Sequence, residues 1–465
     1  MRRFLTWKWL GRAAIAVAVL AGLNALVLPL AVRWHAGWKL SNITARLDRD
    51  DPGWRWPDIA REANAKLPPD DRNPLVLGLT AYALLPGRSD GWTKALPKWE
   101  KYPPNVTLDA PAIAKLDAAF LSCGPAAKLA LVMADMPDVG GEFVNPSTPG
   151  YGRIPRWISL SGLTLALRAN AEVAAHARRD GEAIRCVRAS LAISRAIDQE
   201  PTSMGQIIRI QHCRQVVSAA ERVLNLTDRG EGLAELQAEL ERESKVPTLF
   251  LAARGSRGQT DDIDTLVQSG TTTGAPGGKV GDWAVRRNGH ADAALALDLL
   301  TRCVEIGRLP EGQQAAAVRE LSPLTVNKAL YPITSTLVPA VYRVAQESIV
   351  CSGQLAAVAV GIACERYRRK FGQWPATLAD IPKDILPAVP TDPGDGLPIK
   401  YRRLTDRVVI YSVGPDGIDH GGDLSEATPQ AQRDYGIRIY DVAFRRLPAP
   451  PPAVKPRPET PPGDS

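Results

Sequence analysis

The residues that most suggest chemistry are aspartates in a glycine-rich segment near the C-terminal end. Asp416, Asp419 and Asp423 fall within residues 411–423, which also hold four glycines, and Asp441 follows the next apolar run. Calcium prefers oxygen ligands from carboxylates, carbonyls and water, held by a backbone flexible enough to wrap the ion. The pattern predicts a calcium site formed by these four aspartates.

A second interpretation of the same segment needs no metal. Aspartate and glycine are favoured in turns, because the Asp side chain bonds backbone N–H groups two residues further on and glycine tolerates positive φ. The spacing of Asp416, Asp419 and Asp423 also differs from that of an EF-hand loop, which alternates acidic positions and closes with Glu. From the sequence, a calcium site and plain Asx turns both stay open.

The common catalytic motifs are missing from the sequence. The five histidines are scattered, and neither H-E-x-x-H nor G-x-S-x-G occurs. Residues 277–280, G-G-K-V, resemble the end of a phosphate loop. However, Thr273 stands where that loop needs its first glycine, and Val280 where it needs Ser or Thr. We therefore predict no catalytic and no cofactor-binding residues, with a hydrolase of unrecognised type in the helical region as the alternative.

The acidic segment must be positioned by the elements around it. Residues 408–411, V-V-I-Y, and 437–440, I-R-I-Y, have the β-branched and aromatic composition of strands. Between residues 341 and 362, apolar and small side chains recur every three or four positions, which predicts a long helix that Gly372 ends. The acidic segment is thus expected to follow a strand that packs near this helix.

Three short motifs in this region resemble one known family. Residues 364–375, C-E-R-Y-R-R-K-F-G-Q-W-P, look like the end of the long helix in the major pseudopilins of type II secretion. Residues 389–393, V-P-T-D-P, with Gly396, Pro398 and Tyr401, are similar to that family's next motif. Residues 411–422 resemble its acidic loop. The likeness covers about 100 of the 465 residues.

The resemblance implies a C-terminal domain in which a long helix packs on a small antiparallel sheet and the acidic loop binds calcium. The chain departs from the family in two ways. Residues 1–12 lack the processing leader, and some 300 residues separate the apolar N-terminal segment from the long helix. We therefore do not expect it to polymerise into a pilus-like fibre.

The apolar segment near the N-terminus predicts a membrane anchor. Residues 13–32 are twenty positions without a charge, which is the length needed to cross a bilayer as a helix. Trp7 and Trp9 precede it, and Trp34 and Trp38 follow it, as in interfacial aromatic belts. The basic residues before it favour a cytoplasmic N-terminus. A cleaved signal peptide is the rival, but a good cleavage site is lacking.

The remaining segments are assigned by pattern. Residues 35–330 are expected to be mainly helical, because leucines and alanines between 157 and 245 recur at helical spacing in hairpin-like pairs. Residues 253–290, rich in Gly, Thr and Asp, predict a long loop. Residues 331–446 form the pseudopilin-like domain, and the Pro-rich residues 447–465 predict a disordered tail.

The charge distribution and the cysteine spacing bear on nucleic-acid binding, structural zinc and disulfides. The formal net charge of +7 comes from scattered basic residues rather than from a block, so nucleic acid is not an expected partner. The six cysteines form no C-x-x-C pair, which argues against structural zinc. Outside the cytoplasm an even count is compatible with disulfides, and buried free thiols explain the same residues.

The sequence as a whole predicts an α+β protein: residues 1–34 with a transmembrane signal anchor, a helical central region, and a small C-terminal domain of a long helix plus an antiparallel sheet. We expect a single-pass protein of the cell inner membrane, with its C-terminal part extracytoplasmic. The expected function is non-enzymatic. The helical region is expected to bind protein partners in secretion- or envelope-associated interactions.

Overall fold

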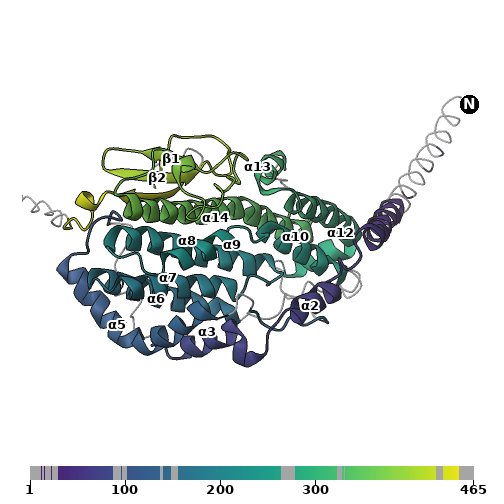
Figure 1. Ribbon diagram of the computed structural model, residues 1–465. Coiled ribbons are helices and arrows are strands. Elements are labelled where there is room, and N and C mark those ends of the chain that lie inside the picture. The colour runs from purple at the N-terminus through teal and green to yellow at the C-terminus, as the bar shows by residue number, and fades with distance from the viewer. Residues whose placement is uncertain are drawn as a thin grey trace, which may run out of the picture.

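The computed structural model describes residues 12, 15, 22, 30–86, 96, 102–136, 140–147, 156–262, 278–321, 327–328, 330–425 and 433–449. Figure 1 shows one long helix, α14, running across the molecule, with a small sheet on one side and layered helices on the other. The chain is therefore mixed α+β, with its strands near the C-terminal end, as the sequence predicts.

The central helices occupy the region where helical periodicity is strongest. They are α6 (Leu160–His176), α7 (Asp180–Arg195), α8 (Ser203–Leu226) and α9 (Leu233–Glu243). Outside them lie α2 (Trp56–Ala65), α3 (Pro74–Ala83) and α5 (Ala110–Ala130). Short 3₁₀ turns join several of these elements: Asp70–Arg72, Leu131–Asp135, Arg156–Ser159, Gln259–Asp262, Leu378–Asp380 and Val442–Phe444.

Where the structure describes it, the expected long loop at 253–290 is helical. Helix α10 (Thr248–Gly258) runs into a 3₁₀ turn that ends at Asp262, and α12 (Gly278–Gly307) begins well before residue 290. Residues 263–277 lie outside the described residues. Gly255 lies where two segments approach closely, because an added Cβ would meet the Pro201 carbonyl oxygen at 1.5 Å, so this glycine serves helix packing rather than a loop. Helix α13 (Glu311–Glu320) follows.

The long helix and the sheet agree with the sequence. Helix α14 spans Pro332–Phe371 and ends at Gly372, whose φ of 77° suits glycine. Strands β1 (Lys400–Arg403), β2 (Arg407–Ser412) and β3 (Tyr435–Tyr440) form an antiparallel sheet in the order β1-β2-β3. β1, K-Y-R-R, was not predicted, because an edge strand with charged side chains lacks apolar alternation.

The largest core joins the two parts of the chain that the sequence assigned to separate domains. Buried apolar residues of α7, α8 and α9 pack with those of α14, β2 and β3 in one cluster. Val187, Val216 and Leu236 belong to it together with Val358 and Ile437. The core is therefore continuous across residue 331.

A clasp at residues 441–447 adds a second link. Leu447 donates its N–H to the carbonyl of Asn105 at 3.0 Å, and Thr107 donates to the carbonyl of Leu447 at 2.8 Å. The Asn105 side chain also donates to the carbonyl of Phe444 at 2.7 Å. These bonds tie the end of the sheet to the segment that precedes α5.

The N-terminal helix leads away from the body, at the right of Figure 1. Residues 30–50 are helical, and we call them the stem. The predicted span, 13–32, lies outside the described residues apart from Ile15, Gly22 and 30–32. Among the described helices, α14 is long and apolar enough to cross a membrane, but 83% of its most apolar window is buried inside the protein. The helical segments Ala110–Ala119 and Leu121–Asp135 are bent by 62° relative to each other. Taken together as one helix, they are also long and apolar enough to cross a membrane.

Candidate functional site

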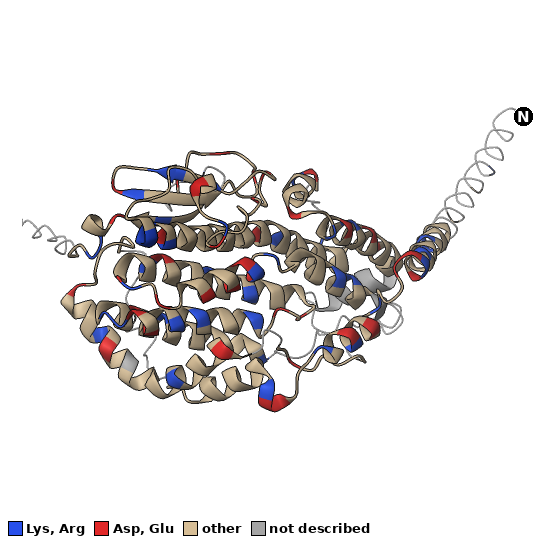
Figure 2. Ribbon diagram, in the orientation of Figure 1, with Lys and Arg blue, Asp and Glu red and all other residues tan. Residues whose placement is uncertain are grey.

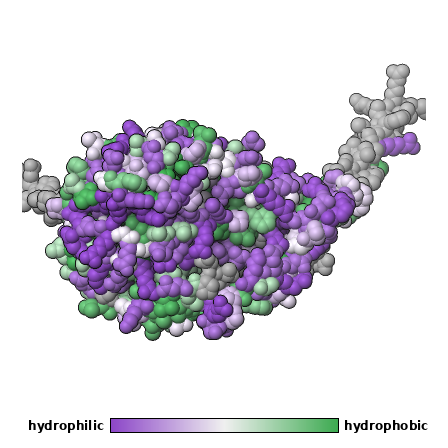
Figure 3. Space-filling model, in the orientation of Figure 1, coloured by the Kyte–Doolittle hydropathy of each residue, from purple (hydrophilic) through white to green (hydrophobic). Residues whose placement is uncertain are grey.

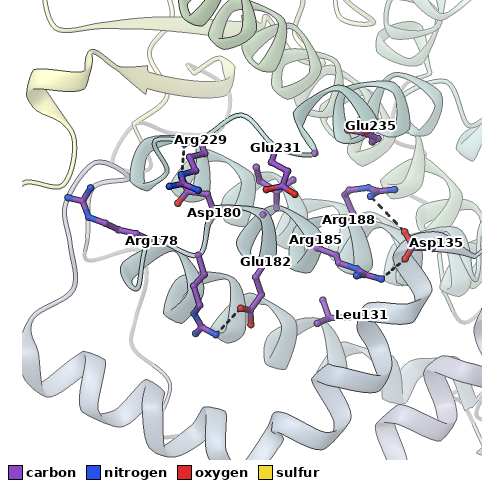
Figure 4. Close-up of a pocket in the computed structure, with 14 residues that line it drawn as sticks. Leu131, Asp135, Arg178, Asp180, Glu182, Arg185, Arg188, Arg229, Glu231 and Glu235 are labelled. Atoms are coloured by element: carbon purple, nitrogen blue, oxygen red, sulfur yellow. Dashed lines mark hydrogen bonds and ion pairs between the residues drawn. The ribbon is translucent and has the colours of Figure 1, made fainter.

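A charged groove opens where the α6–α7 turn meets the connection between α8 and α9. It has a volume of about 700 Å³ and is polar along most of its wall. Figure 4 shows the charged side chains around it, which come from α7, from the α8–α9 connection and from the 3₁₀ turn Leu131–Asp135. Its lining residues are Leu131, Asp135, Arg178, Arg179, Asp180, Gly181, Glu182, Ile184, Arg185, Arg188, Arg229, Glu231, Gly232 and Glu235.

Four arginines of the groove wall are paired with carboxylates, and one of these is Arg178, whose Nη1 lies 2.8 Å from Asp228 Oδ2. Arg185 pairs with Asp135, and Arg179 Nη1 lies 2.8 Å from Glu182 Oε2. Arg188 Nη2 lies 2.7 Å from Glu239 Oε1 beneath the wall. Burial lowers the pKa of Arg188, but the hydrogen bond and charge of Glu239 outweigh it and raise that pKa overall. These pairs place basic and acidic groups side by side along the wall.

The backbone of the groove is fixed by one buried carboxylate. Asp180, the first residue of α7, is 5% exposed, and its Oδ2 accepts N–H bonds from Asp228 at 2.8 Å and Arg229 at 2.5 Å. This carboxylate joins the start of α7 to the α8–α9 connection. At the rim, Arg178 adopts φ of 58°, a left-handed conformation that is rare for residues other than glycine.

Besides the buried Asp180, three charged side chains of the groove make no ion pair within the part of the chain that the structure describes: those of Arg229, Glu231 and Glu235. All three are exposed. Glu231 lies over Gly181, where an added Cβ would come within 3.1 Å of its Oε2. In Figure 4 Glu231 stands between Asp180 and Arg188. These groups are available to an incoming ligand of either charge.

Figure 2 shows basic and acidic residues mixed over the helices, without a segregated basic face. The face of the molecule in Figure 3 is mainly hydrophilic with scattered apolar spots. Among the described residues that Figure 2 draws, the basic side chains do not gather into a track of the kind that nucleic-acid binding requires.

The three aspartates of the acidic loop each form an Asx turn. Asp416 Oδ1 accepts the N–H of Ile418 at 3.1 Å, and Asp419 Oδ1 accepts that of Gly421 at 2.8 Å. Asp423 Oδ1 accepts the N–H of Ser425 at 2.9 Å. The turn interpretation therefore describes these side chains well.

Asp441, the fourth predicted ligand, lies elsewhere. The acidic loop starts after Ser412, which pairs with Tyr435, whereas Asp441 follows Tyr440, which pairs with Arg407 at the other end of the sheet. Asp441 instead accepts a hydrogen bond from Trp374 Nε1. The structure thus separates it from the loop, because the strand leading to it runs away from the loop.

Two residues that the sequence did not single out organise the loop. The carboxylate of Asp434 is fully buried and accepts N–H bonds from His420 at 3.2 Å and Gly422 at 2.7 Å. From α13, Arg319 donates to the carbonyl of Pro415 at 2.9 Å and lies against Gly417. No local pattern marks Arg319, since about a hundred residues separate it from the loop.

The donor set fits calcium poorly. Within the described residues, no group of three or more His, Cys, Asp or Glu side chains is placed to hold a metal ion. Among the described residues of the loop, the buried carboxylate oxygen without a hydrogen-bond partner is Asp416 Oδ2, which lies 3.9 Å from His420 Nε2. Calcium binding at the loop stays a prediction. Asp416 is the residue to test, because its Oδ2 would be free to bind the ion.

A serine–histidine pair lies between α6 and α8. Ser161 Oγ and His212 Nε2 are 3.2 Å apart, and His212 is 1% exposed. Burial lowers the pKa of His212 to about 4. Its Nδ1 is buried without a hydrogen-bond partner in the described structure, so the pair lacks the third group that orients the histidine of a catalytic triad.

Comparison with known proteins gives no family. No protein-family model, no curated protein and no solved structure matches this chain.

Proposed function

We propose that this chain is a membrane-anchored, non-enzymatic protein of the bacterial envelope whose helical body binds a protein partner at the charged groove. The observation that carries the proposal is the groove itself: a wall of arginine–carboxylate pairs that leaves the exposed side chains of Arg229, Glu231 and Glu235 without an ion pair among the described residues. Such a surface has no nucleophile–base pair and offers both signs of charge.

The stem supports the membrane anchor. Trp34 and Trp38 are 74% and 55% exposed at its outer end, where indole rings would meet a membrane interface. On its inner face Leu40, Ile43 and Leu47 are buried against Trp54 and α12. The stem is therefore fixed to the body at one end and directed toward the predicted span, residues 13–32, at the other. This arrangement agrees with a single-pass protein whose body is extracytoplasmic.

The C-terminal part supports a pseudopilin-like domain in its arrangement. The long helix α14 packs on β2 and β3 through Val358, Ile410 and Ile437, and the acidic loop follows β2. These features agree with the order of elements that the resemblance implies. Calcium at the loop belongs to the proposal only through Asp416, because the carboxylates are not gathered around one point.

A polypeptide is the partner class that this groove favours. The lining holds five arginines and five carboxylates, so its formal charge is balanced. A polyanion would be repelled by half of these groups, whereas a protein segment with both acidic and basic side chains finds complements among them. The hydrolase alternative rests on the pair of Ser161 and His212, which lines neither the charged groove nor the smaller pocket beside α13.

The test is photo-crosslinking in living cells with a photoreactive amino acid at position 231 of the full chain. We expect a discrete crosslinked protein, which the charge reversal Glu235→Lys removes. The matched control is position 320 on α13, where Glu320 is exposed and outside the groove. Equal crosslinking at 231 and 320, or none at 231, would contradict the groove as the binding site.

The anchor is tested separately. After alkaline carbonate extraction the full chain should stay with the membrane, and protease added to spheroplasts should reach the body. Release into the supernatant, or protection from protease, would contradict the proposed location.

A further inference from the structure

An extended segment, residues 102–108, connects the start of α5 with the clasp, and we call it the strap. At the left of Figure 1 it rises from α5 toward the 3₁₀ turn Val442–Phe444. Val106 and Leu108 are 7% and 3% exposed, so the strap packs on the body. Asn105 and Thr107 belong to the strap and make the hydrogen bonds of the clasp. The groups that hold the strap therefore also hold the clasp.

Side chains of two helices hold the strap. Arg222 of α8 donates to the carbonyl oxygens of residues 102, 103 and 106 at 3.3, 3.1 and 3.3 Å. From α6, His176 Nε2 accepts the N–H of Leu108 at 3.3 Å. Glu172 lies one turn before His176 and pairs with Arg222 through both of its carboxylate oxygens. One connected set of hydrogen bonds thus joins α6, α8 and the strap.

The bond from Leu108 fixes the protonation state of His176. A backbone N–H can only donate, so Nε2 must offer its lone pair and the proton of the neutral ring must be on Nδ1. An imidazolium carries an N–H on both nitrogens and cannot accept a hydrogen bond. The strap in this position therefore requires a neutral His176.

Charged groups from four elements face this imidazole: Glu172 of α6, Arg222 of α8, Asp117 of α5 and Arg446 of the clasp. Burial is the main influence on the pKa of His176 and lowers it; the two carboxylates oppose this lowering and the two arginines add to it. Glu172 Oε2 lies 3.9 Å from His176 Nε2. A proton on Nε2 turns this nitrogen into a donor, for which Glu172 is an acceptor within reach.

We propose that His176 is an acid-sensitive latch that holds the strap at neutral pH and releases it when Nε2 takes up a proton. The N–H of Leu108 then loses its acceptor, and Glu172 is shared between His176 and Arg222. Both attachments of the strap weaken together, and the clasp loosens with them.

The direction of the pH dependence follows from the neutral state that the closed latch requires. Because the folded-state pKa of His176 is lowered, the latch stabilises the strap fully above the unfolded value of 6.5 and loses this contribution as pH falls below it. The inference concerns the contacts of the strap and stands apart from both the groove and the membrane anchor.

The test is hydrogen–deuterium exchange of the full chain, purified in detergent and analysed by mass spectrometry with overlapping peptides that isolate the Leu108 amide. Protection is expressed relative to the unfolded chain at the same pH, which removes the pH dependence of intrinsic exchange. Between about pH 7.5 and about pH 5 we expect the protection of Leu108 to fall roughly fivefold or more, as one hydrogen bond is lost. The fall should begin below pH 6.5.

Two variants assign the effect. His176→Gln places a neutral amide at this position, whose oxygen can accept the N–H of Leu108, so its protection should be the same at both pH values. The matched control, His212→Gln, removes another buried histidine and should keep the wild-type loss at Leu108.

Three results would overturn the latch: equal protection of Leu108 at both pH values in the wild type, an equal fall in His176→Gln, or a fall that His212→Gln removes. Should His176→Gln not fold, the wild-type profile decides. The logarithm of protection should be flat above pH 6.5 and then fall by up to about one per pH unit, as for uptake of one proton. A profile that stays flat contradicts the proposal.

Discussion

Arg445 and Glu365 form an ion pair with both side chains removed from water. Arg445 Nη2 lies 2.9 Å from Glu365 Oε2, and the two side chains are 3% and 0% exposed. Arg445 belongs to the clasp and Glu365 to α14, so the pair fixes the end of the sheet segment to the central helix. Arg445 also donates to the carbonyl of Leu224 in α8 at 3.1 Å.

Removing one partner of this pair should be strongly destabilising. We expect Glu365→Gln to lower the free energy of unfolding by about 3–5 kcal/mol, because the Arg445 guanidinium would stay buried without its counter-charge. The control is Asp384→Asn, which breaks the pair of Lys370 and Asp384, two groups that are 53% and 66% exposed. Exposed pairs contribute about 0–1 kcal/mol. Similar losses in denaturant titrations of the two variants would contradict the prediction.

The same carboxyl predicts acid sensitivity. Burial raises the pKa of Glu365, but the hydrogen bond of Arg368 and the charge of Arg445 prevail and lower it from 4.5 to about 2. A carboxyl with a lowered folded-state pKa stabilises the fold above its unfolded pKa. This contribution, about 3 kcal/mol, should be lost as pH falls from about 5 to 2. Tm measured over that range should fall less steeply in Glu365→Gln than in the wild type.

Two arginines with positive φ should respond in opposite ways to glycine. Arg178, at φ 58°, holds only an exposed pair with Asp228, so Arg178→Gly should stabilise by about 1 kcal/mol through relief of backbone strain. Arg446, at φ 56°, donates to the carbonyls of Ala175 and His176 in α6 and Leu226 in α8. Arg446→Gly should therefore destabilise by about 2 kcal/mol. Denaturant midpoints of the two variants measure these changes. A lower midpoint for Arg178→Gly than for the wild type would contradict backbone strain at residue 178.

Features that depend on residues close together in the sequence could be predicted, whereas contacts between residues far apart in the sequence could not. The span of α14, its end at Gly372 and strands β2 and β3 follow from local periodicity and turn chemistry. The roles of Arg445 and Arg319 do not, since their partners lie 80 and 96 residues away. The groove was missed for the same reason: it is made where separate turns meet.

The buried histidine makes a further pH prediction. Burial lowers the pKa of His212 from 6.5 to about 4, so below pH 6.5 the unfolded chain binds a proton that the folded chain does not. The folded state should therefore lose about 3 kcal/mol of stability as pH falls from 6.5 to 4. Burial raises the pKa of Asp198 to about 7, which acts in the opposite sense. The difference between wild type and His212→Gln isolates the histidine, and parallel Tm profiles would rule the effect out.

Ser161 is expected to be unreactive. With Nδ1 of His212 unpartnered, no acid holds the imidazole in the tautomer that accepts the serine proton. A fluorophosphonate probe should therefore label wild type and Ser161→Ala equally weakly. Strong labelling that disappears in Ser161→Ala would favour the hydrolase alternative over the binding protein.

Substitutions in and beside the acidic loop distinguish a carboxylate with a structural role, Asp434, from a predicted calcium ligand, Asp416. Asp434→Ala should lower the free energy of unfolding by about 1–3 kcal/mol in calcium and in EDTA alike, because it leaves two backbone N–H groups without their acceptor. The calcium expectation predicts instead a Tm rise in calcium that Asp416→Ala removes. A calcium effect that survives Asp416→Ala would place any ion elsewhere.

The bonds between Asn105, Thr107 and Leu447 bear on how the molecule is made. A chain that emerges from the ribosome N-terminus first cannot complete its core until α14, the sheet and residue 447 have been synthesised. Completion of this core therefore waits for residue 447, as expected of contacts so distant along the chain. For the extracytoplasmic body that we propose, this dependence would keep the nascent chain unfolded and competent for export.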